Sequence, residues 1–278
     1  MINILNKYYG IKIDYYKKYN EGIIFFVNGD YFYFFNTQLS EKDIRENNFV
    51  TFFKIRNIML HQFIINNYGD FVSEGYILIK LNHLIDEISF KELENFNVSI
   101  SKKADIGFYD KWVSRLDYLE KQLTELSDNK FINNSFDYFV GIAEQLLGFI
   151  KDNYDDSGES FVIHQKFNLN TIDFYNPVNV TIGNEFNDIA SYIHIKNDWN
   201  LLSNILDKIN TNDKVYLFVK LAFPFEYFRA INLYITGDES KFELISSFVN
   251  NIEQYERYLT KISYLFGYNI FYWIKKDN

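Results

Sequence analysis

The hydrophobic pattern of this 278-residue chain changes its period near residue 83, and this change limits the folds that the chain can adopt. Before that point, apolar residues come in short β-favouring runs, of which residues 23–27 and 31–35 are the clearest. Asn28-Gly29-Asp30 separates these two runs, and an Asn-Gly turn between β-favouring segments is typical of a tight hairpin. The pattern therefore predicts a pair of antiparallel strands early in the chain.

A second set of β-favouring runs follows at residues 63–65 and 76–81, with a turn signal between them at residues 67–70. Between the two sets, Ser40 and Asp43 have the spacing of a capping box, which predicts a helix running to about Met59. Residues 1–83 are thus expected to form a small lobe, an antiparallel sheet with one helix.

From about residue 84, apolar residues recur at helical steps of three and four. Two stripes are clear, namely Trp112, Leu116, Leu119, Leu123 and Leu126, and then Phe139, Ile142, Ala143, Leu146 and Ile150. Further along the chain, Asn187 is expected to cap one helix, and Pro224 to begin another that ends before Gly237. A stripe from Ile245 to Ile262 predicts one long helix that closes at Gly267.

An irregular region interrupts these helices, with short strands predicted at residues 161–164 and 178–180 around Pro177. The expected fold class is α+β, with an N-terminal lobe over residues 1–83 and a mainly helical lobe over residues 84–278. The two lobes are expected to meet near residues 81–85. A functional loop is expected within the interruption, at residues 162–185.

The composition excludes several classes of protein. With no Cys, the chain has no disulfides, thiolate nucleophiles or Cys-ligated zinc. A formal net charge of −9 argues against sequence-independent nucleic-acid binding, which relies on Lys and Arg to neutralise phosphates. No apolar run approaches the roughly 20 residues of a membrane span, and polar residues come too early for a secretory signal. We therefore expect a cytoplasmic protein without a nucleic-acid partner.

Common catalytic motifs are missing from the sequence. Neither a Walker-type loop nor a Gly-rich dinucleotide loop occurs, and neither does the metalloprotease or nucleophile-elbow motif. No two of the four histidines, which are His61, His83, His164 and His194, have the i,i+4 spacing of a helical metal pair. A zinc site is therefore not expected.

The order of a small sheet lobe followed by a helical lobe with a His-containing loop is that of kinase-like proteins. The loop at residues 162–171, Val-Ile-His-Gln-Lys-Phe-Asn-Leu-Asn-Thr, resembles the His-Gly-Asp loop of the aminoglycoside-phosphotransferase clan. Within that clan the chain is more similar to the YutH-type spore-coat group, which is related to the CotS coat kinases. The other matching stretches, in shared order, are Ile106-Gly107, Lys111-Trp112, Arg115-Leu116-Asp117, residues 138–144, Asp188-Ile189-Ala190, residues 221–224, Glu226-Tyr227-Phe228 and residues 254–258.

The resemblance implies a kinase-like fold whose catalytic positions carry other residues. After His164 in the loop, the catalytic-base Asp falls at Lys166, and a lysine cannot accept a hydroxyl proton at neutral pH. The loop Asn falls at Thr171 or, with one residue of slack, at Asn170, and the magnesium Asp falls near residues 183–185. We therefore expect these positions to be degenerate and no residue of the loop to be catalytic.

Two further parts of a phosphotransferase are absent from the small lobe. Phosphoryl transfer needs a Lys on an N-lobe strand to hold phosphate, and residues 31–35 contain none. The first strand is not Gly-rich either. Similar losses are typical of the YutH-type group, so the resemblance implies that no cofactor is used. ATP and Mg²⁺ are expected only if the chain is a phosphotransferase after all.

Asp173 mimics a metal ligand, because Ile172-Asp173-Phe174-Tyr175 is similar to the Ile-Asp-Phe metal strand of active members of the clan. It follows His164 too closely, however, for a loop, a strand, a turn and a return strand at about 3.3 Å per residue. A turn or surface carboxylate is the alternative. No metal site is expected, and Asp173 and Glu185 are its only weak candidates. We expect Asp188 to cap or brace the loop and Lys166 to be a solvated cation or to contact an anion.

Three functions follow from these residues. The leading hypothesis, implied by the YutH-type resemblance, is a noncatalytic pseudokinase that associates with other spore-coat proteins. It is expected first in the mother-cell cytoplasm and then in the spore coat. The alternatives are a divergent small-molecule phosphotransferase that uses ATP, with Asp173 or Glu185 holding magnesium, and a pseudokinase that binds a small ligand.

The C-terminus is rich in aromatic residues, which supply large contact areas at low entropic cost. If they are exposed, they predict a surface for protein association; if they are buried, they close the core of the helical lobe. The residues concerned are Tyr255, Tyr258, Tyr264, Tyr268, Phe271, Tyr272 and Trp273.

Overall fold

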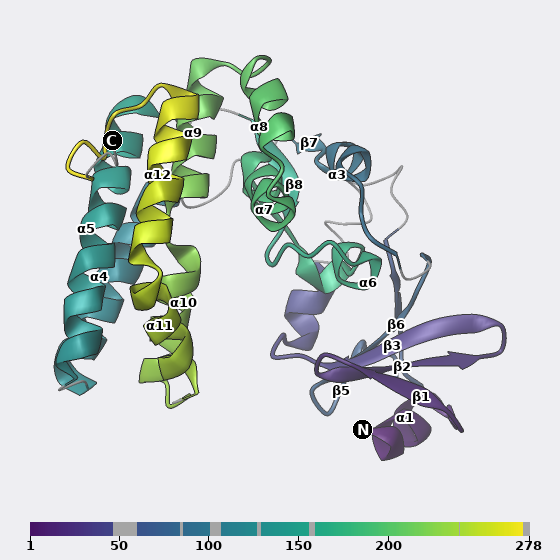
Figure 1. Cartoon of the computed structure of the whole chain (residues 1–278). Helices are drawn as coiled ribbons and strands as arrows, with labels where there is room; N and C mark the ends of the chain where they lie inside the picture. The colour runs from purple at the N-terminus through teal and green to yellow at the C-terminus, as the bar shows by residue number, and fades with distance from the viewer. Residues whose placement is uncertain are drawn as a thin grey trace. The chain divides into compact units, whose positions relative to one another are not determined.

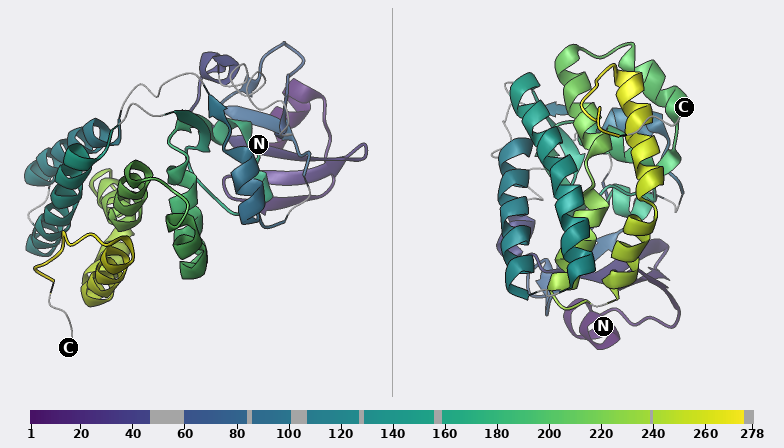
Figure 2. Two further views of the ribbon diagram at one scale, coloured as in Figure 1. Left: turned by 90° about the horizontal axis from the view of Figure 1, so that it is seen from above. Right: turned by 60° about the vertical axis from the view of Figure 1, so that its left-hand side comes forward.

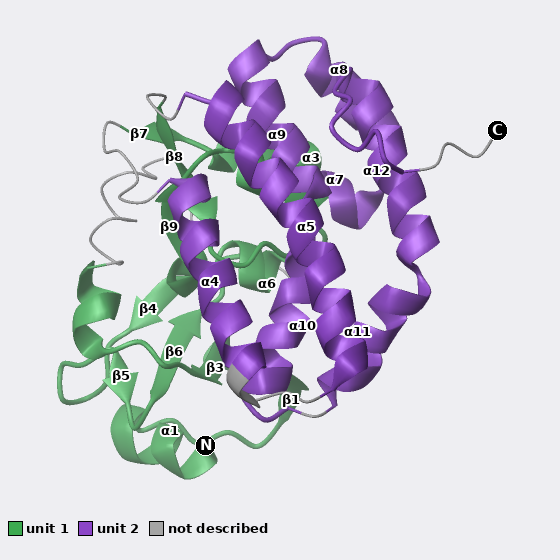
Figure 3. Ribbon diagram, turned by 90° about the vertical axis from the view of Figure 1, so that its left-hand side faces the viewer, with its two compact units in different colours: residues 1–103, 159–192 green, residues 104–158, 193–278 purple. Residues whose placement is uncertain are grey.

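The computed structural model describes residues 1–46, 60–83, 86–100, 107–126, 129–155, 159–238 and 240–274. The chain divides into two compact units, one of residues 1–103 with 159–192 and one of residues 104–158 with 193–278 (Figure 3). The first unit therefore includes the N-terminal sheet together with the predicted functional loop. The predicted meeting of two lobes near residues 81–85 involves residues 84 and 85, which lie outside the described part, and it stays a prediction.

The first unit is built on an antiparallel sheet with the strand order β1-β2-β3-β6-β4, in which β5 also pairs with β6 (Figure 1). Its strands are β1 Tyr16–Tyr19, β2 Gly22–Val27, β3 Asp30–Asn36, β4 Gln62–Ile64, β5 Val72–Ser73 and β6 Tyr76–Lys80. The predicted hairpin is confirmed: Val27 lies opposite Asp30, and Asn28 and Gly29 both have positive φ angles, of 53° and 90°. Such a turn has the twist that two-residue hairpins require.

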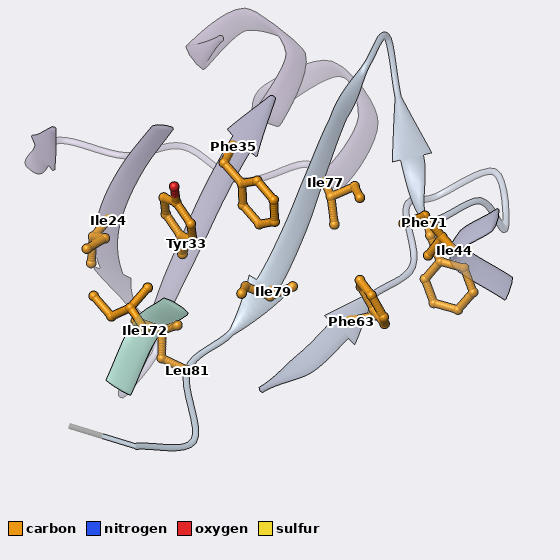
Figure 4. Packing of buried hydrophobic residues seen from close by; sticks show 10 residues of the cluster. All are labelled: Ile24, Tyr33, Phe35, Ile44, Phe63, Phe71, Ile77, Ile79, Leu81 and Ile172. Atoms are coloured by element: carbon orange, nitrogen blue, oxygen red, sulfur yellow. The ribbon is translucent and has the colours of Figure 1, made fainter. Parts of the chain in front are cut away.

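Alternation along the strands gives the sheet two apolar faces. Leu5 of helix α1, Ile2–Tyr9, packs on the face that carries Ile23 and Phe34. The opposite face carries Ile24, Tyr33 and Phe35. Ile44, from a helix at residues 41–46, belongs to the same buried cluster and lies beside Phe71 (Figure 4). This second face becomes important below, because the predicted functional loop also contacts it.

The predicted capping box at Ser40 is confirmed. The backbone N–H of Asp43 donates to Ser40 Oγ at 3.2 Å, and the backbone N–H of Ser40 donates to Asp43 Oδ2 at 2.9 Å. Two N–H groups at the helix start are thereby satisfied. The rest of the predicted helix, up to Met59, lies outside the described residues.

The remainder of the first unit contains a three-stranded antiparallel sheet with the order β7-β8-β9. Its elements are α3 Phe90–Phe96, β7 Ser99–Ile100, β8 Ser160–His164, α6 Thr171–Phe174, the 3₁₀ helix η1 Pro177–Asn179, β9 Val180–Gly183 and α7 Phe186–Lys196, which continues into the second unit. The predicted strand at residues 161–164 is confirmed. The strand predicted at residues 178–180 is wrong over most of its length, because Asn176 caps a 3₁₀ turn there by accepting a hydrogen bond from the N–H of Val178 at 3.1 Å.

The predicted cap of α7 is also wrong by one turn. The side chain of Asn184, not Asn187, accepts a hydrogen bond from the N–H of Phe186 at 2.9 Å, and the helix begins at Phe186. Both asparagines are good capping residues, and the sequence alone gave no reason to prefer the earlier one.

The second unit is helical (Figure 2). Its helices are α4 Phe108–Leu126, α5 Lys130–Asn153, α8 Trp199–Leu206, α9 Thr211–Ala222, α10 Phe225–Ile235, α11 Lys241–Asn250 and α12 Ile252–Phe266. The predicted stripe of α5 is buried throughout, and Leu116, Leu119 and Leu123 of α4 are buried as well. The single long helix predicted to end at Gly267 is wrong, because α11 and α12 meet at Asn251, whose side chain donates to the carbonyl of Ser247.

The aromatic residues at the C-terminus mostly point inward. The hydroxyls of Tyr255 and Tyr258 donate to the carbonyls of Ala222 and Leu221, and Phe271 is only 6% exposed. Phe271 therefore cannot belong to a contact surface, and the predicted surface is wrong for it. Tyr255, Tyr258 and Tyr268 are half-buried. Tyr264, Tyr272 and Trp273 are exposed. No helix in the described ranges is both long and apolar enough to cross a membrane.

Candidate functional site

His164 and Asp188 form a buried pair at the base of the predicted functional loop. His164 ends β8, and Asp188 lies in the first turn of α7. The two side chains are fully buried, with Nδ1 of His164 at 2.7 Å from Oδ2 of Asp188. The backbone N–H of His164 also donates to both carboxylate oxygens, at 3.1 and 3.2 Å. Asp188 therefore holds both the main chain and the ring of His164.

The second ring nitrogen of His164 also faces an oxygen. Its Nε2 lies 2.8 Å from the carbonyl oxygen of Phe174, which can only accept a hydrogen bond. The arrangement is satisfied when one proton lies on Nε2 and another lies between Nδ1 and the carboxylate. The ring also stacks on Phe96, with the two centroids 4.2 Å apart. Because the pair is sealed on all sides, it braces β8, α6 and α7 and presents no face to a substrate.

Lys166 is exposed in the turn after β8, and its main chain is held by Asn179. The N–H of Lys166 donates to Oδ1 of Asn179 at 2.8 Å, and Nδ2 of Asn179 donates back to the carbonyl of Lys166 at 2.6 Å. The N–H of Gln165 donates to the carbonyl of Asn179 at 2.8 Å. Asn179 thus closes the neck of the loop through backbone groups, and the ammonium of Lys166 takes no part in this closure.

Asn170 and Thr171 start helix α6 and serve its backbone. Oδ1 of Asn170 accepts a hydrogen bond from the N–H of Ile172 at 2.8 Å, as a helix cap does. Oγ1 of Thr171 accepts a hydrogen bond from the N–H of Asp86 at 3.1 Å, and the N–H of Thr171 donates to the carbonyl of Asp86 at 3.1 Å. The two positions that the resemblance assigns to the loop Asn are therefore used to hold α6 in place.

The Asp173 carboxylate is paired with two donors. Its Oδ2 accepts hydrogen bonds from the hydroxyl of Tyr19, on β1, and from Nδ2 of Asn168, both at 2.8 Å. Partial burial and the neighbouring carboxylate raise the pKa of Tyr19 above its ordinary range, so the phenol keeps the proton that it donates. A metal at this carboxylate oxygen would have to compete with both donors.

Glu185 lies just before α7, where its backbone carbonyl accepts hydrogen bonds from the N–H groups of Asp188 and Ile189. The same carbonyl accepts a hydrogen bond from Nδ2 of Asn97 at 3.3 Å. Within the described residues, no group of three or more His, Asp or Glu side chains is placed to hold a metal ion. The main chain of Glu185 thus supports the start of α7.

His61 is a member of this site that the sequence did not single out. Its Nδ1 accepts a hydrogen bond from the N–H of Asn82, and its Nε2 lies 3.1 Å from the carbonyl of Thr171, to which it donates. Burial, reinforced by the neighbouring His83, lowers the pKa of His61 to about 3. The ring is therefore neutral, with its one proton on Nε2. It links β4 and the end of β6 to α6.

The structure thus brings His164 and Asp188 together and places Thr171 and Asp173 in one short helix that Asn170 caps. Lys166 and Glu185 lie at the two ends of the loop. Tyr19, His61 and Asn179 complete the site. No local signal points to Tyr19, because it is 154 residues from Asp173 in the chain.

Comparison with known proteins relates this architecture to one group of enzymes. No protein-family profile and no curated protein matches the chain. An aminoglycoside phosphotransferase from Alicyclobacillus acidocaldarius is similar in structure, with a TM-score of 0.57 and 11% identity over 95% of this chain and 96% of that one. Spectinomycin phosphotransferase is similar in its complex with ADP and spectinomycin (TM-score 0.58, 12% identity, 89% and 93% covered) and in its AMP-bound complex (0.53, 11%, 95% and 96%).

At identities of 11–12%, these likenesses concern the fold alone. The chain has the kinase-like fold of aminoglycoside phosphotransferases, with an antiparallel sheet at its N-terminus and a mainly helical C-terminal part. The predicted fold class, α+β and kinase-like, is thereby confirmed, and the resemblance to the wider clan holds at the level of the fold.

Proposed function

We propose that this chain is a noncatalytic kinase-like protein, a pseudokinase, that uses no cofactor and acts by associating with other proteins. The observation that carries the proposal is the use of the loop's polar groups for internal support. Asp188 is paired with His164, Asp173 with Tyr19 and Asn168, and the start of α6 with Asp86. A catalytic loop needs such groups directed at the reactants.

The small lobe supports the same conclusion. Kinases cover the nucleotide phosphates with a Gly-rich loop and hold them with a Lys on the third strand. Here β1 and β2 are joined by a tight turn at Asn20-Glu21, and β3 reads Asp-Tyr-Phe-Tyr-Phe-Phe-Asn. The turn offers no glycine-rich cradle of N–H groups, and the strand carries no cation.

The destination of the protein follows from the YutH-type resemblance. We propose that the chain is made in the mother cell and is then incorporated into the spore coat through contacts with other coat proteins. Its fluorescent fusion should collect around the forming spore, and the Lys166→Ala variant should collect equally well because the proposal gives this cation no catalytic task. A fusion that stays diffuse in the mother cell throughout spore formation would count against the coat location.

An ATP-dependent phosphotransferase is the second candidate, because the similar structures are phosphotransferases and one of them contains ADP and spectinomycin. In this chain Asp173 or Glu185 would then hold magnesium. The test is release or transfer of phosphate from Mg·ATP, without an acceptor and with a panel of aminoglycosides and spectinomycin. We expect turnover at the level of the protein-free blank.

Matched variants make the assay decisive. Lys166→Asp restores a carboxylate at the base position and should still be inactive, because β3 supplies no cation for the phosphates. Magnesium-dependent turnover by the unaltered chain, lost in Asp173→Ala or Glu185→Ala, would establish the phosphotransferase and refute the noncatalytic proposal.

A further inference from the structure

The two faces of the N-terminal sheet, which consists of β1–β6 and is called the small sheet below, are not equivalent. In protein kinases the Lys of the third strand contacts the nucleotide phosphates and also pairs with a Glu of the helix that follows that strand. The phosphates and this helix therefore share one face of the sheet. In this chain the helix at residues 41–46 follows β3, and its Ile44 belongs to the same buried cluster as Ile24 and Tyr33. The face that carries this cluster corresponds to the nucleotide side.

That face is already filled by the chain itself. Ile172, in α6, has no exposed surface and belongs to the same buried cluster as Ile24, Tyr33 and Leu81. Figure 4 shows Ile172 beside Ile24 and Leu81 on this side of the sheet. Val178, farther along the loop, packs against the same cluster. The loop thus contributes a core residue to the sheet.

Hydrogen bonds from three places in the first unit hold α6 against the sheet. The hydroxyl of Tyr19 donates to Asp173, and Nε2 of His61 donates to the carbonyl of Thr171. The N–H of His61 donates to the carbonyl of Tyr175 at 2.9 Å. The N–H of Asp86 donates to Thr171, as described above. These donors are far from α6 in the sequence, so the contact is a tertiary one and not a local turn.

We propose that α6 is a built-in plug that closes the nucleotide face of the small sheet, with Ile172 as the inserted side chain and Tyr19–Asp173 as the latch. This inference rests on the proposed noncatalytic function and gives it a structural cause. A nucleotide could reach the face only if Ile172 left the core and the hydrogen bonds of Asp173 and Thr171 broke. The sheet therefore binds its own loop where a kinase binds nucleotide.

The absence of cysteine from the chain permits a clean test by thiol labelling. Three single-cysteine variants are compared: Ile172→Cys in the plug, Ile79→Cys as a control that is equally buried in the same cluster, and Tyr15→Cys as a control at an 89% exposed position. Each is reacted with a thiol reagent under native conditions, with and without millimolar Mg·ADP. Circular dichroism checks the folding of each variant.

If the plug is seated, Ile172→Cys should react as slowly as Ile79→Cys, on the order of a hundredfold more slowly than Tyr15→Cys, because reaction requires local opening. Mg·ADP should change none of the rates. Labelling of Ile172→Cys at the rate of Tyr15→Cys, with Ile79→Cys still protected, would overturn the proposal. So would a nucleotide that accelerates the labelling of Ile172→Cys alone.

If Ile172→Cys fails to fold, hydrogen exchange of the unaltered chain replaces it. The N–H groups of Ile172 and Tyr175 should exchange as slowly as those of β6, and exchange as fast as that of an unstructured peptide would refute the plug. The two proposals fail separately. Nucleotide binding without turnover, seen as an increase in Tm with Mg·ADP, would overturn the plug and leave the noncatalytic function intact. ATP turnover would overturn both.

Discussion

Acidification should lower the stability of the first unit because one buried imidazole, that of His61, does not take up the proton that it binds in the unfolded chain. The ring is neutral, accepts a hydrogen bond from Asn82 through Nδ1 and donates to Thr171 through Nε2. A second proton on Nδ1 would face the N–H of Asn82 and would place a charge in a buried position. His83 and Tyr175 are the other titratable side chains whose rings face it, with centroids at 5.8 and 6.1 Å. Neither is a carboxylate that could offset the charge.

The magnitude follows from linkage between protonation and folding. The pKa of His61 is about 3 in the folded chain, against an ordinary value of 6.5. Between these values the unfolded chain binds a proton that the folded chain does not, so the stabilisation is complete above 6.5 and is lost as the pH falls toward 3. At a pH of about 5 the loss is about 2 kcal/mol, from about 1.4 kcal/mol per pKa unit. This figure depends mainly on the ordinary value, because pH 5 is far above the folded pKa.

The assay compares urea unfolding at a pH of about 7 and about 5 for the unaltered chain, His61→Gln and His194→Gln. Circular dichroism is the signal, because all three tryptophans, Trp112, Trp199 and Trp273, lie in the second unit. His194 is exposed, so its variant controls for the loss of one histidine. The contribution of carboxylates that titrate in this range is the same in all three proteins and cancels when they are compared.

On acidification, the free energy of unfolding of the unaltered chain and of His194→Gln should each fall by about 2 kcal/mol more than that of His61→Gln, because only His61→Gln removes the buried imidazole. An equal loss in all three proteins would refute the assignment of a neutral, buried His61.

Three further predictions concern packing and pairing. Asp188→Ala should lower the free energy of unfolding by about 3–5 kcal/mol because it leaves a buried partner unpaired, whereas Asp188→Asn, whose amide can pair with a neutral ring, should cost only about 1 kcal/mol in urea unfolding. Gly22→Ala should cost about 2 kcal/mol or more in thermal unfolding followed by circular dichroism, because its Cβ would clash with the carbonyl oxygen of Phe34. Phe271→Ala should cost about 3–5 kcal/mol and the adjacent Tyr272→Ala less than about 0.5 kcal/mol in tryptophan-monitored unfolding, since the first side chain is 6% exposed and the second 79%. Equal losses of stability in Asp188→Ala and Asp188→Asn, or in Phe271→Ala and Tyr272→Ala, would contradict the contacts described.

Features that depend on neighbouring residues could be predicted from the sequence. The hairpin at Asn28-Gly29 and the capping box at Ser40 are decided within four residues, so their signals are complete in the printed sequence. The break at Asn251 was missed because the apolar stripe continues across it, from Ile245 to Ile262. A continuous stripe does not reveal where a helix is interrupted, since the two halves bury the same face.

The contacts of the candidate site could not be predicted in the same way, because they join residues that are far apart in the sequence. The sequence pointed to His164 and Asp188 through a family resemblance, but their pairing across 24 residues is a tertiary contact. The sequence predicts for Asp173 either a weak metal ligand or a surface carboxylate, whereas its partner in the structure, Tyr19, comes from the first strand of the chain. No spacing rule connects residues so far apart. The roles assigned to Lys166 and Glu185 stay predictions.

The closed base of the loop at residues 165–179 would position a catalytic loop and can equally position an inserted side chain. His164 lies opposite Val180 in the β8–β9 ladder, so residues 165–179 leave and return at the same place. Asn179 closes the neck of this loop through Gln165 and Lys166. A loop closed at its base loses less entropy when its tip is docked than an open chain does. The tip of the loop is helical and carries Ile172. The same scaffold that could present reactive groups can therefore insert an apolar side chain into the close-packed core of the sheet.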